Sequence, residues 1–69
     1  MLAMEIVLNG QAKILAGPLS VAALVAELGF TGKRIAVERN GEIVPKSTYA
    51  QVMIVAADRL EIVVAVGGG

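Results

Sequence analysis

The chain has 69 residues and a mass of 7.1 kDa, which is enough for one domain and no more. Hydrophobic residues make up 57% of it, six Lys and Arg residues balance six Asp and Glu residues, and there is no Cys or His. This composition predicts a globular domain, excludes nucleophilic triads and zinc sites, and argues against nucleic acid as a partner because no excess of cations is present.

Two further features concern the place where the protein works. The longest charge-free run, residues 14–26, is shorter than a bilayer span and contains Gly, Pro and Ser. Residues 1–5 lack the basic start of a signal peptide. We therefore expect a soluble, cytoplasmic protein that does not enter a membrane.

The first elements along the chain are predicted to be a β-hairpin. Apolar residues alternate with others over residues 4–8, which is typical of a strand with one buried face. Asn9-Gly10 follows, and both residues tolerate the positive φ of a tight hairpin turn. The return strand is expected over residues 11–16.

A helix is predicted next. Gly17-Pro18 ends the return strand, and the hydroxyl of Ser20 is placed to cap the free amides of a helix. Gly29 can end this helix. The apolar residues that follow the cap fall at i, i+3, i+4 and i+7, and they are Val21, Leu24, Val25 and Leu28.

Residues 30–34 should form a loop, and a second hairpin should follow it. Residues 35–39 are rich in β-forming side chains, Asn40-Gly41 supplies another tight turn, and residues 42–44 form a short return strand that Pro45 closes.

Residues 47–57 are predicted to be irregular, because two patterns compete there. Ser47 could cap a helical turn, whereas residues 52–55 would suit a short strand equally well. The alternation returns over residues 60–66, which should form a long apolar strand.

This order of elements predicts an α+β fold in which one main helix covers one face of a mixed sheet. The last strand is apolar enough to lie centrally, and pairing with the first strand would be parallel. That arrangement is the β-grasp, or ubiquitin-like, fold. We expect residues 1–66 to form the β-grasp domain and residues 67–69 to form a flexible glycine tail.

The three terminal glycines are the feature that points to chemistry. They could be a frayed end or a cloning remnant. Alternatively, because glycine has no Cβ, they could thread a narrow channel in another protein and carry the terminal carboxylate about 10 Å beyond the fold. In a chain without reactive side chains, this carboxylate is the plausible reactive group, and it needs activation, most simply as an acyl adenylate made from ATP.

One other glycine-containing segment, residues 29–33, is only superficially similar to a phosphate-binding loop. Two residues separate its glycines where four are needed, and it follows a predicted helix instead of a strand. The end of a helix and a solvated loop account for both glycines.

Several segments together resemble a known family. These are AVERNGEIVP at residues 36–45, the aromatic Tyr49, DRLEIV at residues 58–63 and the terminal glycines. They look like the thiamine-pathway sulfur carrier of the ubiquitin-like sulfur carrier family. Two departures are a glycine triplet in place of the usual pair, and Ala57-Asp58-Arg59 where the family often has an Asp-Gly-Asp turn.

The resemblance implies a carrier protein, which is not itself an enzyme and needs no cofactor or metal. An adenylating enzyme would activate the Gly69 carboxylate with ATP, a sulfurtransferase system would convert it to a thiocarboxylate, and thiazole synthase would consume the sulfur. Gly68 and Gly69 match the family directly, and Gly67 would add reach. Pro45 and Tyr49 also match, and we interpret them as a strand stop and a packing aromatic residue.

Two alternatives remain open at this point. The carrier could serve molybdopterin or another sulfur acceptor, or the protein could be a ubiquitin-like modifier or docking module. The strand alternation also predicts a partner-docking patch beside the tail. If the first and last strands are neighbours, this exposed patch consists of Val7, Val63 and Ala65.

Overall fold

The computed structural model describes residues 3–65, so the predicted glycine tail at residues 67–69 lies outside the described part. The first hairpin forms where an Asn-Gly pair interrupts the alternating pattern. Strand β1 (Met4–Leu8) pairs antiparallel with β2 (Gln11–Leu15), and Asn9 and Gly10 between them have φ of 51° and 81°. The predicted turn is confirmed, and β2 ends one residue before the predicted return strand does.

The second hairpin repeats this chemistry. Strand β4 (Ile35–Arg39) pairs antiparallel with β5 (Glu42–Ile43), and Asn40 and Gly41 have φ of 53° and 86°. Strand β5 is one residue shorter than predicted. In both hairpins the positive φ that these turns require falls on the residues best able to adopt it.

Helix α1 (Val21–Glu27) begins where the capping pattern predicts. The backbone N–H of Ala23 donates to Oγ of Ser20 at 3.0 Å, which satisfies one of the free amides of the first turn. The helix ends before Gly29, which has a φ of 82°. In the described range, 3–65, no helix has both the length and the hydropathy needed to cross a bilayer.

The prediction that residues 47–57 are irregular is wrong in part. Two short elements form there, the 3₁₀ turn η1 (Lys46–Thr48) and the strand β6 (Met53–Ile54). Strand β6 pairs antiparallel with an unpredicted strand, β3 (Leu19–Ser20). Ser47 does not cap η1, because Pro45 precedes the 3₁₀ turn and gives it no side-chain hydrogen bond. Each competing pattern is therefore satisfied, but only over two or three residues.

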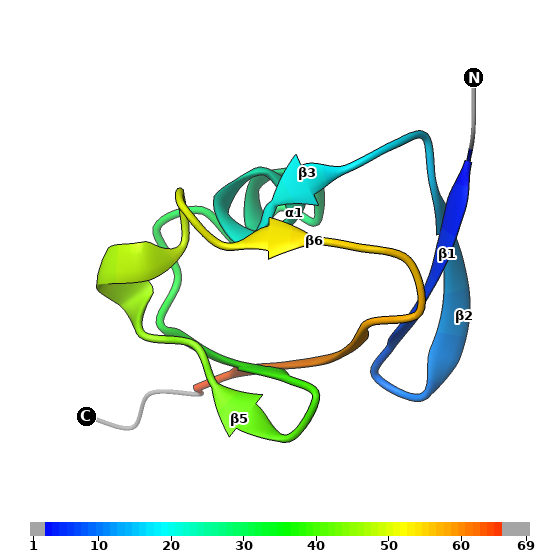
Figure 1. Ribbon diagram of the computed structural model, residues 1–69. Helices are drawn as coiled ribbons and strands as arrows, with labels where there is room; N and C mark the ends of the chain where they lie inside the picture. Colours follow the sequence, from blue (N-terminus) through cyan, green and yellow to red (C-terminus); the bar gives the residue numbers. More distant parts are fainter. Residues whose placement is uncertain (1–2, 66–69) are drawn as a thin grey trace.

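Strand β7 (Arg59–Val64) is the central strand of the five-stranded sheet, whose order is β2-β1-β7-β4-β5. It runs parallel to β1 and antiparallel to β4. In Figure 1, β7 is the orange to red segment that leads toward the C-terminus. The parallel register pairs Val7 with Arg59 and Leu8 with Leu60. The predicted central position and parallel pairing are confirmed, and the fold is an α+β β-grasp.

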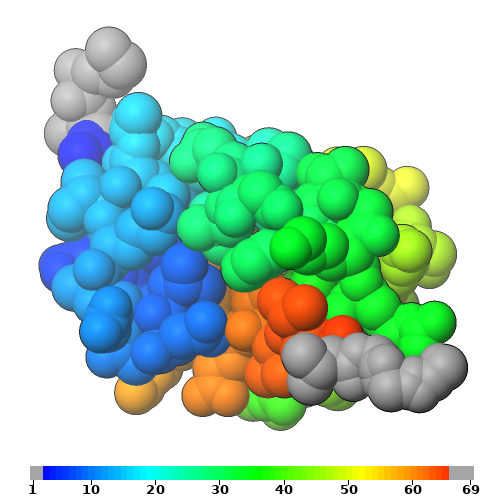
Figure 2. Space-filling model, turned by 180° about the vertical axis from the view of Figure 1, so that it is seen from behind, coloured from blue at the N-terminus to red at the C-terminus, as the bar shows by residue number. Residues whose placement is uncertain are grey.

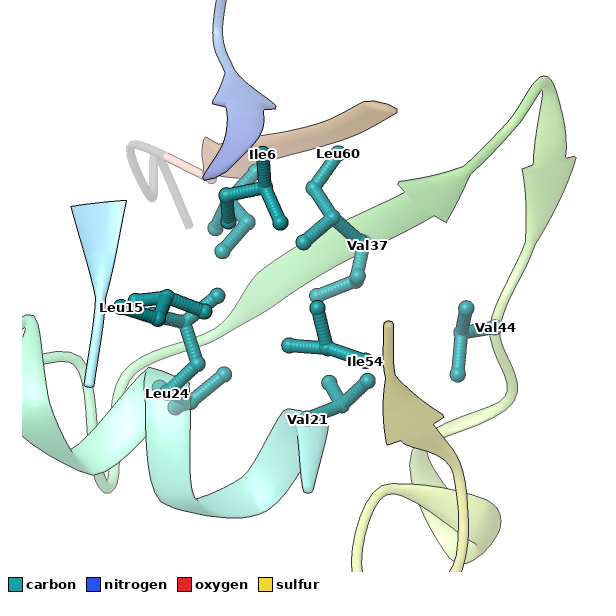
Figure 3. Packing of buried hydrophobic residues seen from close by; sticks show 10 residues of the cluster. Ile6, Leu15, Val21, Leu24, Val37, Val44, Ile54 and Leu60 are labelled. Atoms are coloured by element: carbon teal, nitrogen blue, oxygen red, sulfur yellow. The ribbon is translucent and has the colours of Figure 1, made fainter. Parts of the chain in front are cut away.

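The core lies between α1 and one face of the sheet (Figure 3). The apolar faces of β1 and β7 contribute Ile6, Leu60 and Ile62, which are buried, and Met4 and Leu8 are half-buried against them. Other elements complete the core with Leu15, Val21, Leu24, Val25, Val37, Val44 and Ile54. One helix covers one face, so the opposite face of the sheet is left to solvent or to partners.

Candidate functional site

The candidate site is the carboxyl end of β7, after which the sequence continues through Val66 to the three glycines. Val64 pairs with Ile35 of β4, and the backbone N–H of Ala65 donates to the carbonyl of Arg34 at 2.8 Å. Figure 2 shows this end of β7, in red, against the green residues that begin β4. Strand β4 therefore holds the chain in place up to Ala65, where the described part ends.

The start of β7 is fixed by a buried carboxylate, Asp58, which is 4% exposed. Its oxygens accept hydrogen bonds from Arg39 Nε at 2.9 Å, Asn40 Nδ2 at 3.1 Å and the backbone N–H of Val55 at 2.9 Å. Asn40 Oδ1 in turn accepts from the backbone N–H of Arg59 at 2.9 Å. The turn of the second hairpin is thereby joined to the first residues of β7.

The environment of Asp58 also determines its acidity. Burial opposes ionisation, but the hydrogen bonds from Val55, Asn40 and Arg39 and the positive charge of Arg39 outweigh it, so that the pKa of Asp58 lies below the ordinary value of 3.8. Asp58 is consequently charged and paired at neutral pH. Its surroundings are those of a structural group, because every neighbour named here stabilises the anion.

The predicted docking residues do not all lie together. Val63 is 62% exposed, pairs with Ala36 of β4 and lies two residues before Ala65, so these three share one exposed face. Val7 faces the same side but pairs with Arg59, which lies about 13 Å along β7 from Val63 at 3.3 Å per residue. The assumption that Val7 adjoins Val63 is therefore wrong.

Sequence reasoning missed two other apolar side chains on this outer face. Ile14 of β2 and Ile43 of β5 are each 63% exposed and pair with Glu5 and Glu38, respectively. Glu38 also lies directly opposite Glu61 of β7. Ile14 and Ile43 could have been placed on the outer face from the strand register, but only once the order of the strands in the sheet was known. The outer face is therefore a series of separate apolar positions divided by carboxylates.

The predicted tail residues Gly67, Gly68 and Gly69 lie outside the described residues. Within residues 3–65, no group of three or more His, Cys, Asp or Glu side chains could hold a metal ion. Tyr49 is half-buried against the core, which confirms that it is a packing residue. Pro45 stands after β5 and immediately before η1, at the position predicted to end the strand.

Comparison with known proteins supplies the family. The model of the ThiS family matches residues 6–69. The crystal structure of the thiamine biosynthesis protein ThiS from Geobacter metallireducens superposes with a TM-score of 0.82 at 26% identity, over 96% of this chain and all of that one.

Two sequence relatives differ in length. A thiazole synthase from Paramagnetospirillum magneticum is 50% identical over 66 residues, which are 96% of this chain but only 20% of that protein. The uncharacterized protein ycf40 of Porphyra purpurea is 35% identical over 94% of this chain and 92% of its own length. The chain thus spans about a fifth of the length of the thiazole synthase and nearly all of the smaller relative.

The β-grasp sheet with β7 at its centre and the family match over residues 6–69 agree, and the chain belongs to the ThiS family of sulfur carriers in thiamine biosynthesis.

Proposed function

We propose that Gly69 is the residue that carries sulfur, as a C-terminal thiocarboxylate, to a thiazole synthase. The observation that carries this proposal is the order of the last residues: three glycines follow, after one intervening residue, a strand end that is hydrogen-bonded to β4. Because the strand end is firmly held, the glycines start from a fixed point on the domain. Residues without side chains can then enter a narrow channel in a partner enzyme. The chain has no Cys or His to hold sulfur in another way.

The chemistry requires three steps, and partners carry out all of them. An adenylating enzyme lets a carboxylate oxygen of Gly69 attack the α-phosphorus of ATP, which releases pyrophosphate and forms an acyl adenylate. A sulfurtransferase persulfide then attacks the acyl carbon and AMP leaves, after which a thiol cleaves the sulfur–sulfur bond and frees the thiocarboxylate. The carrier supplies the acyl group and undergoes no redox change at its carbon.

The choice of thiazole synthase as the acceptor rests on the relative from Paramagnetospirillum magneticum. A segment similar to this chain forms part of a longer protein that is named thiazole synthase. A carrier domain and a synthase that occur in one polypeptide are suited to pass sulfur from one to the other. For this chain we accordingly propose thiazole synthase as the enzyme that consumes the thiocarboxylate.

The test is the intact mass of the protein after incubation with the adenylating enzyme, ATP and a sulfur source. The wild-type protein should gain the mass of an oxygen-to-sulfur exchange. Deletion of Gly69 and the substitution Gly68→Leu should both abolish this gain while leaving thermal unfolding nearly unchanged, because they lie beyond the core. A sulfur gain by the deletion variant would show that the carrying group lies elsewhere.

A glycine change away from the tail provides the matched control. Gly17 lies in an open loop where an added Cβ would meet no atom within 4 Å, and its φ is not positive. Gly17→Ala should therefore form the thiocarboxylate as the wild type does. Adding thiazole synthase and its remaining substrates should then consume the thiocarboxylate and yield the thiazole product.

We also propose that the outer face beside the tail contacts the partner that receives the glycines. The docking patch, as the strand register defines it, comprises Ala36, Val63 and Ala65, and Val7 lies apart from it. Val63→Asp should weaken association with the adenylating enzyme or thiazole synthase while the protein stays folded, because the side chain is mostly exposed. Ile14→Asp is the control, since Ile14 is equally exposed but lies on the edge strand β2. Equal binding by both variants and the wild type would show that docking uses another surface.

A further inference from the structure

A pocket of about 240 Å³ lies near the carboxyl end of α1, on a side of the molecule that the proposed outer-face docking does not use. Val25 of α1 and Ile35 of β4 line its apolar part together with Phe30 and Tyr49. A ligand pocket for a drug-sized molecule is usually larger than this, at about 300 to 1,000 Å³. The size is better suited to a single side chain.

One wall of the pocket follows from how α1 ends. The backbone N–H of Gly29 donates to the carbonyl of Ala26, and that of Phe30 donates to the carbonyl of Val25, each at 3.0 Å. With Gly29 at a φ of 82°, this is the Schellman motif, in which the residue after the glycine folds back onto the helix. Phe30 and Val25 accordingly line the same pocket.

The next turn places cations at the same pocket. The backbone N–H of Lys33 donates to the carbonyl of Phe30 at 2.9 Å, and Gly32 has the positive φ of 82° that the third position of a type II turn requires. Lys33 and Arg34 follow this turn, and both are exposed and line the pocket. Gly29 and Gly32, which superficially suggested a phosphate-binding loop, therefore shape the edge of this pocket.

Further lining residues come from η1 and from the residue that follows it. The carbonyl of Tyr49 accepts a hydrogen bond from the backbone N–H of Ala22 at 2.9 Å, and the carbonyl of Val52 accepts one from the backbone N–H of Val21 at 2.9 Å. These bonds attach the segment after η1 to the first turn of α1. Tyr49 and the exposed Lys46 thereby line the same pocket as Phe30.

The pocket concentrates residue types that are scarce in the chain. The sequence has one Phe, one Tyr and no Trp, and Phe30 and Tyr49 both line this pocket. Three of the six Lys and Arg residues, Lys33, Arg34 and Lys46, line it as well, whereas no Asp or Glu of the described residues does. Tyr and Arg are enriched among residues that dominate protein–protein binding energy.

Among the described residues, the cations of the pocket also lack acidic partners. Over residues 3–65, the one ion pair within 4.0 Å joins Arg39 and Asp58. Lys33, Arg34 and Lys46 are thus left to act on charges outside the described part of the fold. In a chain whose net charge is zero, this is a local excess of positive charge around an apolar depression.

The pocket adjoins the root of the tail. Arg34, which lines the pocket, accepts the hydrogen bond from Ala65, and Ile35, which also lines it, pairs with Val64. A partner seated in the pocket would therefore lie beside the point from which the glycines depart. It would limit the directions in which the tail can be presented.

We propose that this pocket binds an acidic segment of the enzyme that receives the tail, with one apolar side chain of that segment inserted between Phe30 and Tyr49. The three cations select the acidic segment, and the apolar walls account for the inserted side chain, which an inorganic anion lacks. The identity of the enzyme as the partner rests on the proposed function, but the chemistry of the pocket does not. Complementary charges should act mainly by raising the association rate.

The first test compares charge reversals at exposed positions, which should leave the fold intact. Lys33→Glu and Lys46→Glu should each slow association with the tail-receiving enzyme several-fold, and together on the order of tenfold, at low ionic strength. Arg59→Glu changes the net charge equally but lies away from the pocket, so it should have a smaller effect. The differences should shrink as salt is added. Equal effects of all three changes, or no effect of any, would overturn the proposal.

The second test uses probes that do not depend on the proposed function. A short peptide of Asp and Glu residues with one central Phe should shift the backbone amide NMR signals of Phe30, Lys33 and Tyr49, and the same peptide with Gly for Phe should bind at least several-fold more weakly. Shifts of equal size with inorganic phosphate would overturn the proposal in favour of a simple anion site. Absence of peptide binding would also overturn it.

The two proposals can fail separately. If the wild-type protein forms no thiocarboxylate while the acidic peptide binds between the aromatic residues, the proposed function fails and the pocket proposal stands. If the thiocarboxylate forms but the charge reversals associate as the wild type does and the peptide does not bind, the pocket proposal fails alone.

Discussion

The side chain of Asn9 and the backbone of Ile62 form two hydrogen bonds with each other. Asn9 Oδ1 accepts from the backbone N–H of Ile62 at 2.8 Å, and Asn9 Nδ2 donates to the carbonyl of Ile62 at 3.3 Å. Asn9 also adopts the positive φ of the first hairpin turn. One residue thus serves a turn and extends the contact between β1 and the central strand.

This double role predicts that replacing Asn9 with glycine will destabilise the protein, although glycine suits the turn. Asn9→Gly keeps a residue that accepts positive φ but removes both hydrogen bonds to Ile62, so it should lower the free energy of unfolding by about 1 to 2 kcal/mol. Asn9→Asp keeps the acceptor and loses the donor, and it should be intermediate. Chemical denaturation of the three proteins measures this, and a glycine variant as stable as the wild type would show that only the turn matters.

A second prediction concerns acid stability. Because the pKa of Asp58 is lowered in the folded protein, the carboxylate contributes its full stabilisation at pH values above the unfolded pKa, near 3.8, and this contribution is lost as the pH falls from there through the folded pKa. The free energy of unfolding, measured from pH 6 down to pH 2, should therefore fall as the pH drops below about 3.8. Asp58→Asn should be less stable at neutral pH and should show a smaller drop on acidification. A drop of the same size in both proteins would assign the effect to other carboxylates.

A third prediction concerns the turn before β7. The backbone N–H of Asp58 donates to the carbonyl of Val55 at 3.2 Å, and Ala57 in this turn has a φ of 72°, which favours glycine. Ala57→Gly should therefore raise the free energy of unfolding by up to about 1 kcal/mol, despite the greater flexibility of glycine in the unfolded chain. Ala56→Gly, at a neighbouring residue without positive φ, should lower stability. Equal effects at both positions would show that Ala57 is not strained.

A fourth prediction joins the helix end to the pocket. Gly29→Ala places a Cβ at a φ of 82°, and although the Cβ would meet no atom within 4 Å, the backbone conformation should cost about 1 kcal/mol or more. The variant should also bind the acidic peptide more weakly, since Phe30 would no longer be held against Val25. Thermal unfolding and peptide titration measure the two effects. Loss of stability with unchanged peptide affinity would separate the helix end from the pocket.

Local chemistry made much of the fold predictable. The turns at Asn9 and Asn40 and the cap at Ser20 depend on residues within a few positions of each other, and each forms where the sequence indicates. The faces of the strands also follow from alternation, because the side-chain period of a strand is two. The central place of β7 follows from its apolar length.

The sequence does not determine the register between strands that are far apart in the chain. Alternation placed Val7 and Val63 on one face but did not fix how far β1 extends along β7, and the two side chains are consequently separated. The pocket depends in the same way on tertiary contact, because Phe30 and Tyr49 line one pocket through the attachment of the η1 segment to α1. The short β3–β6 pair escaped prediction since two residues carry too little pattern.

The parallel pairing of β1 with β7 has a mechanical consequence. When the two ends of a molecule are pulled apart, parallel neighbouring strands that lead to those ends slide along each other, and their hydrogen bonds must break together instead of one after another. Here the resisting bonds are those from Val7 to Asp58 and from Asn9 to Leu60, with the Asn9–Ile62 pair beside them. If a partner enzyme pulls on the glycines as proposed, the load passes to β7, which is hydrogen-bonded to a neighbouring strand on each side.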